Sequence, residues 1–139
     1  MLKYLLDVEQ SRAVYNYCKP LLQTKMCYNN VFHVVTEYIS KFRAGEWKVA
    51  YGFMTVFDNL LCRHCFIIDE NEKVIDPTIF TGSASTEREY YAMKVFDDID
   101  VYFEAVENNN YYPALDRYLS EQNKQAYEWA EQNGFILTG

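Results

Sequence analysis

The stretch Arg63-His-Cys-Phe-Ile-Ile-Asp-Glu-Asn-Glu-Lys-Val-Ile-Asp-Pro-Thr78 decides how we expect the rest of the chain to fold. Two apolar runs, Cys65 to Ile68 and Val74 to Ile75, flank a short polar segment, which is typical of antiparallel strands joined by a tight turn. His64 lies near the start of the first strand, and Asp76 lies near the end of the second. The hairpin is therefore expected to bring an imidazole and a carboxylate to the same end.

The register of this hairpin decides whether the two side chains meet. Antiparallel partners have residue numbers with a constant sum, and a slip of one residue turns a side chain to the opposite face. We predict that His64 pairs with Asp76, which leaves a loop of residues 69–71 whose last residue, Asn71, takes the left-handed conformation. The alternative is a two-residue turn that pairs Cys65 with Asp76 and turns His64 away.

The segments before the hairpin predict a helix packed on an antiparallel sheet. Residues 46–57 are rich in aromatic and β-branched residues and predict a strand, in which Gly52 permits a bulge or a close backbone approach. Residues 60–69 predict the next strand. Before them, residues 27–42 have helical periodicity, and Asn30 lies off the apolar stripe. That stripe consists of Cys27, Val31, Val34, Val35, Tyr38 and Phe42. The order of helix followed by strands indicates an α+β fold.

The two ends of the chain are expected to complete one domain of 139 residues. The first 20 residues predict a helix that ends at Pro20. Residues 87–96 are ambiguous between helix and strand, whereas residues 101–106 and 113–133 predict helices. We expect a core at about residues 20–80, a helical C-terminal cover at about residues 86–139, and a loop at Thr81 to Thr86 that borders a cleft.

Composition and charge exclude several classes of function. The net charge of −7 and the pI near 4.8 argue against nucleic-acid binding, because no basic stripe is available to neutralise phosphates. No segment is long and apolar enough to predict a membrane span or a signal peptide. We therefore expect a cytoplasmic protein with four reduced cysteines. We expect neither a cofactor nor a metal, and the sequence gives no oligomeric state.

Cys27 lies at the start of its predicted helix, and this position has chemical consequences. The free amides and partial positive charge of a helix N-terminus favour a thiolate over a thiol. Taken alone, a cysteine on an apolar stripe is also a common packing residue. Together with His64 and Asp76, however, Cys27 supplies the nucleophile of a set that also contains a base and an orienting carboxylate.

Four pieces of the sequence, in order, resemble the papain-like and transglutaminase-like cysteine enzymes. They are Cys27-Tyr-x-Asn30, Tyr51-Gly52, His64-x-Phe66 and Val74-Ile-Asp-Pro-Thr78. The resemblance covers about residues 20–80 and implies a papain-like core with Cys27, His64 and Asp76 as the catalytic triad. It also implies Gln23 and the Cys27 amide as oxyanion donors, with Asn30 as a supporting residue. Tyr28 stands where transglutaminases commonly have Trp, which is a departure from their pattern.

These observations predict a thiol-dependent acyl hydrolase or acyltransferase of the peptidase, amidase or deamidase type. Its substrate is expected to be a protein or a peptide-like amide. The alternative from another class is a non-catalytic module on the same fold, which binds a protein partner through an acidic, tyrosine-rich surface. Its candidate anchors are Tyr90, Tyr91, Tyr102, Tyr111, Tyr112 and Tyr118. A third reading is a zinc site made of Cys27, Cys62, His64 and Cys65, although alternation along a strand turns Cys65 away from His64.

Overall fold

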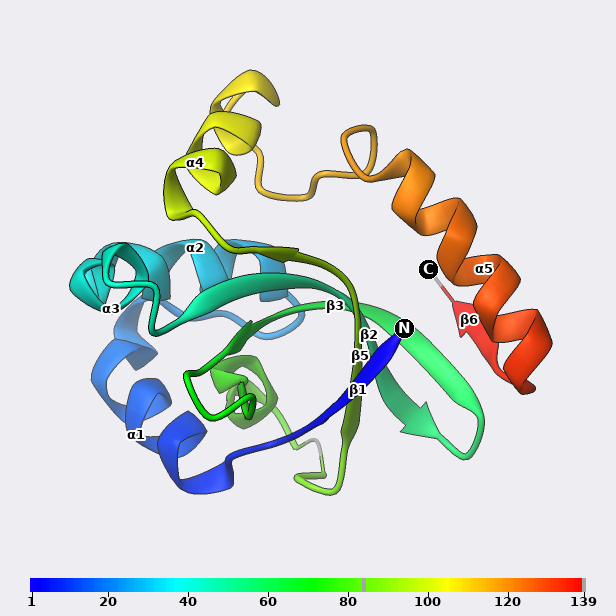
Figure 1. Ribbon diagram of the computed structural model, residues 1–139. Coiled ribbons are helices and arrows are strands. Elements are labelled where there is room, and N and C mark those ends of the chain that lie inside the picture. Colours follow the sequence, from blue (N-terminus) through cyan, green and yellow to red (C-terminus); the bar gives the residue numbers. More distant parts are fainter. Residues whose placement is uncertain (84, 139) are drawn as a thin grey trace.

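The structure, a computed structural model, describes residues 1–83 and 85–138 of the chain (Figure 1). It is an α+β fold in which helices pack around one sheet. The helices are α1 (Val8–Cys18), α2 (Cys27–Glu37), α3 (Ile39–Arg43), α4 (Ile99–Asn108) and α5 (Ser120–Asn133), with short 3-10 turns η1 (Lys19–Leu21) and η2 (Pro77–Thr81). The strands are β1 (Leu2–Leu5), β2 (Lys48–Phe57), β3 (Leu60–Ile68), β4 (Val74–Ile75), β5 (Glu89–Phe96) and β6 (Ile136–Thr138).

The sheet curls until its two edges meet. Its strands run in the order β1-β5-β2-β3-β4 with antiparallel neighbours, and β6 pairs with β3 in parallel. Leu6, directly after β1, forms a bridge with Val74 in β4, and the Asp7 amide donates to the Val74 carbonyl at 2.8 Å. These contacts join the first and last strands of the path, and the strong curvature is visible in Figure 1. The sheet therefore has an enclosed inner face and a convex outer face.

Alternating residues of the strands supply hydrophobic clusters on both sides of the sheet, as expected for side chains that point to opposite faces. On the inner face, Ala50, Phe66 and Tyr90 pack in one cluster. On the outer face, Cys65 and other strand residues pack against α2 and α4 in the larger cluster. The α2 contribution is Val31, Val34 and Val35, all fully buried, and burying each side chain of this size stabilises the fold by about 1.5–3 kcal/mol. The candidate site lies at an edge of the sheet, between a side chain of the inner face and the start of the outer helix α2.

Gly52 allows β5 to approach β2 closely, as the sequence predicted. The β2–β5 register shifts between Tyr51 and Gly52, which is a bulge. A Cβ atom on Gly52 would lie 1.9 Å from the carbonyl oxygen of Tyr91, so no other residue fits without moving a strand. Because Gly52 pairs with His64 on its other side, the bulge lies directly beside the candidate site.

The ends of the chain differ from the sequence prediction. Leu2–Leu5 is strand β1 and not part of a helix, and α1 begins only after Asp7, whose side chain caps the helix by accepting from the Gln10 amide at 3.0 Å. The ambiguous segment 87–96 contains β5, which lies between β1 and β2. The C-terminal part is therefore not a purely helical cover, since it supplies β5 and β6. Among the described helices, none is long and apolar enough to cross a membrane.

The predicted register of the β3–β4 hairpin was wrong, because the two strands are shifted along each other by two residues relative to the prediction. Ile67 pairs with Ile75 and Ile68 with Val74, so the numbers of paired residues add to 142 and not to 140. The loop is consequently residues 70–72, and Glu72, not Asn71, has the positive φ of 57°. An even difference in the sum leaves every side chain on its expected face. His64 and Asp76 are therefore diagonal neighbours on one face and not direct partners.

Candidate active site

Cys27 is the first residue of α2, as expected from the sequence. The preceding residue, Met26, is the N-cap and makes no side-chain capping bond, and the chain enters the helix through Lys25, whose φ is 62°. Without a capping side chain, the first amides of α2 stay available to bind a negatively charged atom. The thiol of Cys27 thus lies beside backbone donors at the positive end of a helix.

His64 and Asp76 are in direct contact on the inner face of the sheet. The Nε2 atom of His64 lies 2.7 Å from Oδ2 of Asp76, and both side chains are buried. Because an ionised carboxylate only accepts hydrogen bonds, Nε2 carries the proton in this contact. The other ring nitrogen, Nδ1, is left to accept a proton from a neighbouring group.

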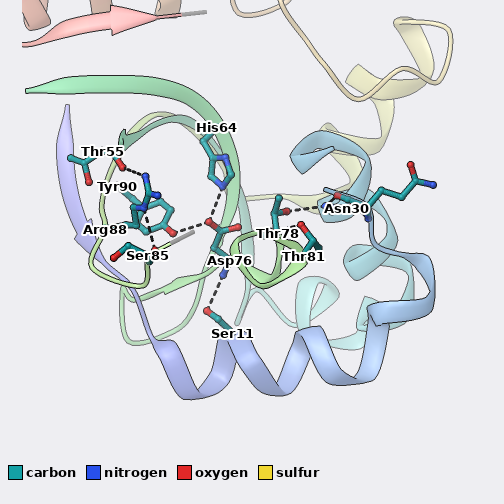
Figure 2. A network of polar contacts seen from close by, with 11 residues as sticks. Ser11, Asn30, Thr55, His64, Asp76, Thr78, Thr81, Ser85, Arg88 and Tyr90 are labelled. Atoms are coloured by element: carbon teal, nitrogen blue, oxygen red, sulfur yellow. Dashed lines mark hydrogen bonds and ion pairs between the residues drawn. The ribbon is translucent and has the colours of Figure 1, made fainter. Parts of the chain in front are cut away.

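Asp76 is held from three directions, as Figure 2 shows. Besides the His64 contact, the Tyr90 hydroxyl donates to the same oxygen, Oδ2, at 2.7 Å. The Asp76 backbone amide donates to Oγ of Ser11 in α1 at 2.9 Å. Ser11, Asp76 and Tyr90 are all fully buried. The position of the carboxylate is consequently fixed by β5 and α1 as well as by its own hairpin.

The protonated form of His64 is stabilised by its surroundings. Burial alone would lower the pKa of His64, but the charge and hydrogen bond of Asp76, followed by those of Cys27, raise the pKa to about 10. Cys27 lies near enough to the ring to contribute to this pKa shift, and both side chains line one pocket. This arrangement favours an imidazolium at neutral pH, which is the form that stabilises a neighbouring thiolate.

Cys27 and His64 lie near a gap between the two strands that pair with one edge of β3. On this edge β3 pairs with β6 through residues 60–62 and with β4 through residues 67–68. Between these segments, no strand in the described part of the chain covers this edge of β3. His64 lies in this interval, and the start of α2 approaches it from the outer side. The gap explains how a cysteine on an outer helix reaches a histidine on the inner face.

A pocket of about 660 Å³ opens onto Cys27 and His64. Its walls are largely apolar and include Tyr28, Met54 and Ile79, and its rim includes residues 81–83 of the loop that the sequence predicted to border a cleft. Residue 84 of that loop lies outside the described part of the chain. The hydroxyl of Thr24 donates to the Thr81 carbonyl at 2.8 Å, and both residues line the pocket. The pocket therefore gives Cys27, which is otherwise buried, a face that is not covered by packed side chains.

Gln23 and Asn30, the predicted supporting residues, bond to each other and not to Cys27, His64 or Asp76. The Gln23 amide donates to Oδ1 of Asn30 at 3.0 Å, and Nδ2 of Asn30 donates to the Gln23 carbonyl at 2.8 Å. Asn30 also donates to the Thr78 hydroxyl at 3.0 Å (Figure 2). The Gln23 side chain is exposed and does not line the pocket. Asn30, predicted to lie off the buried stripe, is buried and joins α2, its entry loop and η2.

Sequence reasoning missed Ser11 and Tyr90 as partners of Asp76. Ser11 shares the buried stripe of α1 with Val14 and Cys18, so a polar residue on an apolar helix face was the available signal. Tyr90 lies in the segment whose secondary structure was ambiguous, and its pairing with β1 and β2 is not local in sequence.

The structure also places the residues of the two alternative readings. Tyr90, Tyr91 and Tyr102 are buried and cannot anchor a partner, whereas Tyr111 and its neighbour Tyr112 are exposed, as is Tyr118. Among residues 1–83 and 85–138, no group of three or more His, Cys, Asp or Glu side chains is placed to hold a metal ion. Burial in the outer core raises the pKa of Cys65 well above its usual value, which disfavours the thiolate that a zinc site needs.

Comparisons of the chain with protein-family models, with curated proteins and with solved structures return no match. The function of this protein is therefore inferred from the geometry of the site itself.

Proposed function

We propose that this protein is a thiol-dependent acyl hydrolase or acyltransferase that uses Cys27 as nucleophile, His64 as base and acid, and Asp76 as the residue that orients His64. The observation that carries the proposal is the buried 2.7 Å contact between His64 and Asp76, with Cys27 beside His64 in the lining of one pocket. A histidine with a purely structural role would not require a cysteine at the start of a helix beside its ring. The papain-like and transglutaminase-like resemblance of the sequence points to the same roles.

In the proposed reaction the Cys27 sulfur attacks a carbonyl carbon, and a C–S bond forms as the carbonyl oxygen gains negative charge. The Cys27 amide, at the free N-terminus of α2, is placed to donate to this oxygen. His64 then gives its proton to the leaving nitrogen, and the C–N bond breaks. A water molecule or an amine next attacks the thioester while His64 takes up its proton. The C–S bond then breaks, the acid or the new amide leaves, and Cys27 and His64 return to their starting state.

Asp76 and its partners serve this cycle by keeping one orientation of the imidazole. The bond from Nε2 to Asp76 leaves Nδ1 toward the thiol, and a ring that turned over would present the wrong nitrogen. The Tyr90 hydroxyl and the Ser11 hydroxyl prevent Asp76 itself from moving. Tyr90 and Ser11 are therefore proposed as positioning residues, since neither lines the pocket.

The proposal is tested by acylation of the protein with 4-nitrophenyl acetate. We expect a burst of nitrophenol and an acetyl group on Cys27, located by peptide mass spectrometry, and the loss of both in Cys27→Ala. Cys62→Ala is the matched control, because Cys62 lines the same pocket and is half-buried. A burst that persists in Cys27→Ala, or acetylation that falls on Cys62, contradicts the assignment of the nucleophile.

A further inference from the structure

Two hollows meet at the candidate nucleophile. The pocket of Cys27 and His64 adjoins a second hollow of about 320 Å³, which lies between the start of α2 and residues 112–116. Lys25, Tyr28 and Arg63 line both hollows. Tyr28 follows Cys27 and Arg63 precedes His64 in the sequence, so a molecule that extends past the reacting thiol contacts all three shared residues.

The charge at this junction is opposite to that of the molecule as a whole. The chain has 20 acidic and 13 basic residues and a net charge of −7. Nevertheless, among the described residues that line the larger pocket, Lys25 and Arg63 are the permanently charged ones, and no acidic side chain lines it. A positively charged cleft in an acidic protein attracts anions toward one place on the surface.

Arg63 and Lys25 differ in their ion pairs. Nη1 of Arg63 donates to Oδ1 of Asp116 at 2.7 Å, and the Arg63 side chain is 19% exposed whereas that of Asp116 is 69% exposed. A guanidinium has five N–H donors, and this bond uses one of them. Lys25 forms no ion pair with any residue in the described part of the chain. Both cations consequently keep donors for a bound anion.

We propose that the substrate carries a carboxylate close to the carbonyl that Cys27 attacks, and that Arg63 and Lys25 bind this carboxylate. The inference rests on the proposed acyl-transfer function and names its substrate class. Among the residues that line the two hollows, Lys25 and Arg63 exceed Asp116 by one positive charge, and the Cys27 thiolate offsets the His64 imidazolium. One carboxylate of a substrate therefore neutralises the junction. Arg63 already binds a carboxylate of the protein itself, and its planar fork suits that group.

Two alkylating reagents of similar size test this inference without a known substrate. Iodoacetate carries a carboxylate and iodoacetamide does not, and each forms a C–S bond with the Cys27 thiolate as iodide leaves. We expect the rate ratio of iodoacetate to iodoacetamide at Cys27 to fall about two- to fivefold in Lys25→Gln and in Arg63→Gln, the range for one partly screened ion pair. Lys124→Gln makes the same charge change on α5, lines neither hollow and is expected to keep the wild-type ratio.

One further variant and two competing anions distinguish the possible outcomes. Arg63→Lys keeps the charge and is expected to keep most of the ratio even if residues 112–116 shift. N-acetylglycine is expected to slow iodoacetamide at lower concentration than inorganic phosphate does. An unchanged ratio in both Gln variants, or stronger protection by phosphate, overturns the carboxylate assignment. The proposed function fails by a different result, namely an iodoacetamide rate that does not depend on His64.

Discussion

Tyr90 and His64 share one oxygen atom of Asp76: the Tyr90 hydroxyl and the His64 Nε2 each lie 2.7 Å from Oδ2. The two donors come from β5 and β3, which are not neighbours in the sheet. Burial and the Asp76 charge raise the pKa of Tyr90, so its hydroxyl stays protonated and continues to donate. The carboxylate is thus held between two strands, and the geometry of His64 depends on both.

Tyr90→Phe removes the hydroxyl and keeps the ring. Because the lost bond is buried and its acceptor is charged, we expect the free energy of unfolding to fall by about 1–3 kcal/mol. The rate of Cys27 alkylation near neutral pH is expected to fall as well, since Asp76 becomes less fixed. Denaturant unfolding and alkylation kinetics measure these effects. Tyr127→Phe, at an exposed tyrosine of α5, is the control and should change neither.

Ser11→Ala leaves the buried backbone amide of Asp76 without its acceptor. We expect a loss of about 1–3 kcal/mol in the free energy of unfolding, the cost of an unsatisfied buried donor. Ser40→Ala, at an exposed serine of α3, is expected to be close to neutral. If Ser11→Ala were as stable as Ser40→Ala, the proposed role of α1 in holding Asp76 would be wrong. The measurement is equilibrium unfolding in urea.

The raised pKa of His64 predicts a pH dependence of stability. Between about pH 6.5, the ordinary pKa of histidine, and about pH 10, its pKa in the fold, the folded state binds one proton more than the unfolded state. The stabilisation is complete below this window and is lost as pH rises through it, with a slope of at most about 1.4 kcal/mol per pH unit.

Cys27→Ala is the suitable background for this measurement, because it removes the proton of the thiol from the balance. We expect its free energy of unfolding to decline from neutral to alkaline pH, since Asp76 still holds the imidazolium. Adding His64→Ala should flatten the decline. Equal slopes in the single and the double variant would show that His64 does not carry the effect.

Gly52→Ala tests the close approach of β5 to β2. The added Cβ would lie 1.9 Å from the Tyr91 carbonyl oxygen, in contact with backbone that cannot move alone. We expect a loss of at least about 3 kcal/mol or a failure to fold. Gly82→Ala is the control for stability, because its Cβ would meet only the Thr24 side chain at 3.6 Å. A folded Gly52→Ala protein of wild-type stability would contradict the observed register of these strands.

The local features of the site could be predicted from the sequence, because they depend on helical periodicity and on the alternation of side chains along a strand. The start of a helix at Cys27 and the shared face of His64 and Asp76 are properties of this kind. The hairpin register was wrong because Asp69 does not belong to the loop: its side chain accepts from the amides of Asn71 at 2.8 Å and Lys73 at 2.9 Å and closes the turn one residue later.

The contacts that are distant in sequence did not follow from these patterns. The insertion of β5 between β1 and β2 and the joining of Leu6 to Val74 depend on tertiary packing, for which single-segment patterns carry no signal. Gln23 was placed by its distance in sequence from Cys27, but the turn at Lys25 directs its backbone to Asn30. Tyr90, which donates to Asp76, and Ser11, which accepts from the Asp76 amide, were missed because both are distant from Asp76 in sequence.

The central claim is that His64 activates Cys27, and the most direct measurement is the pH dependence of iodoacetamide alkylation at each cysteine, read by mass spectrometry. In the wild type we expect Cys27 to react rapidly below about pH 7, where an ordinary thiol reacts slowly, and to slow in His64→Ala. His33→Ala, at the other histidine of the chain and on the same helix as Cys27, should leave the profile unchanged. A Cys27 that reacts like an ordinary thiol in the wild type and in His64→Ala alike would contradict the account.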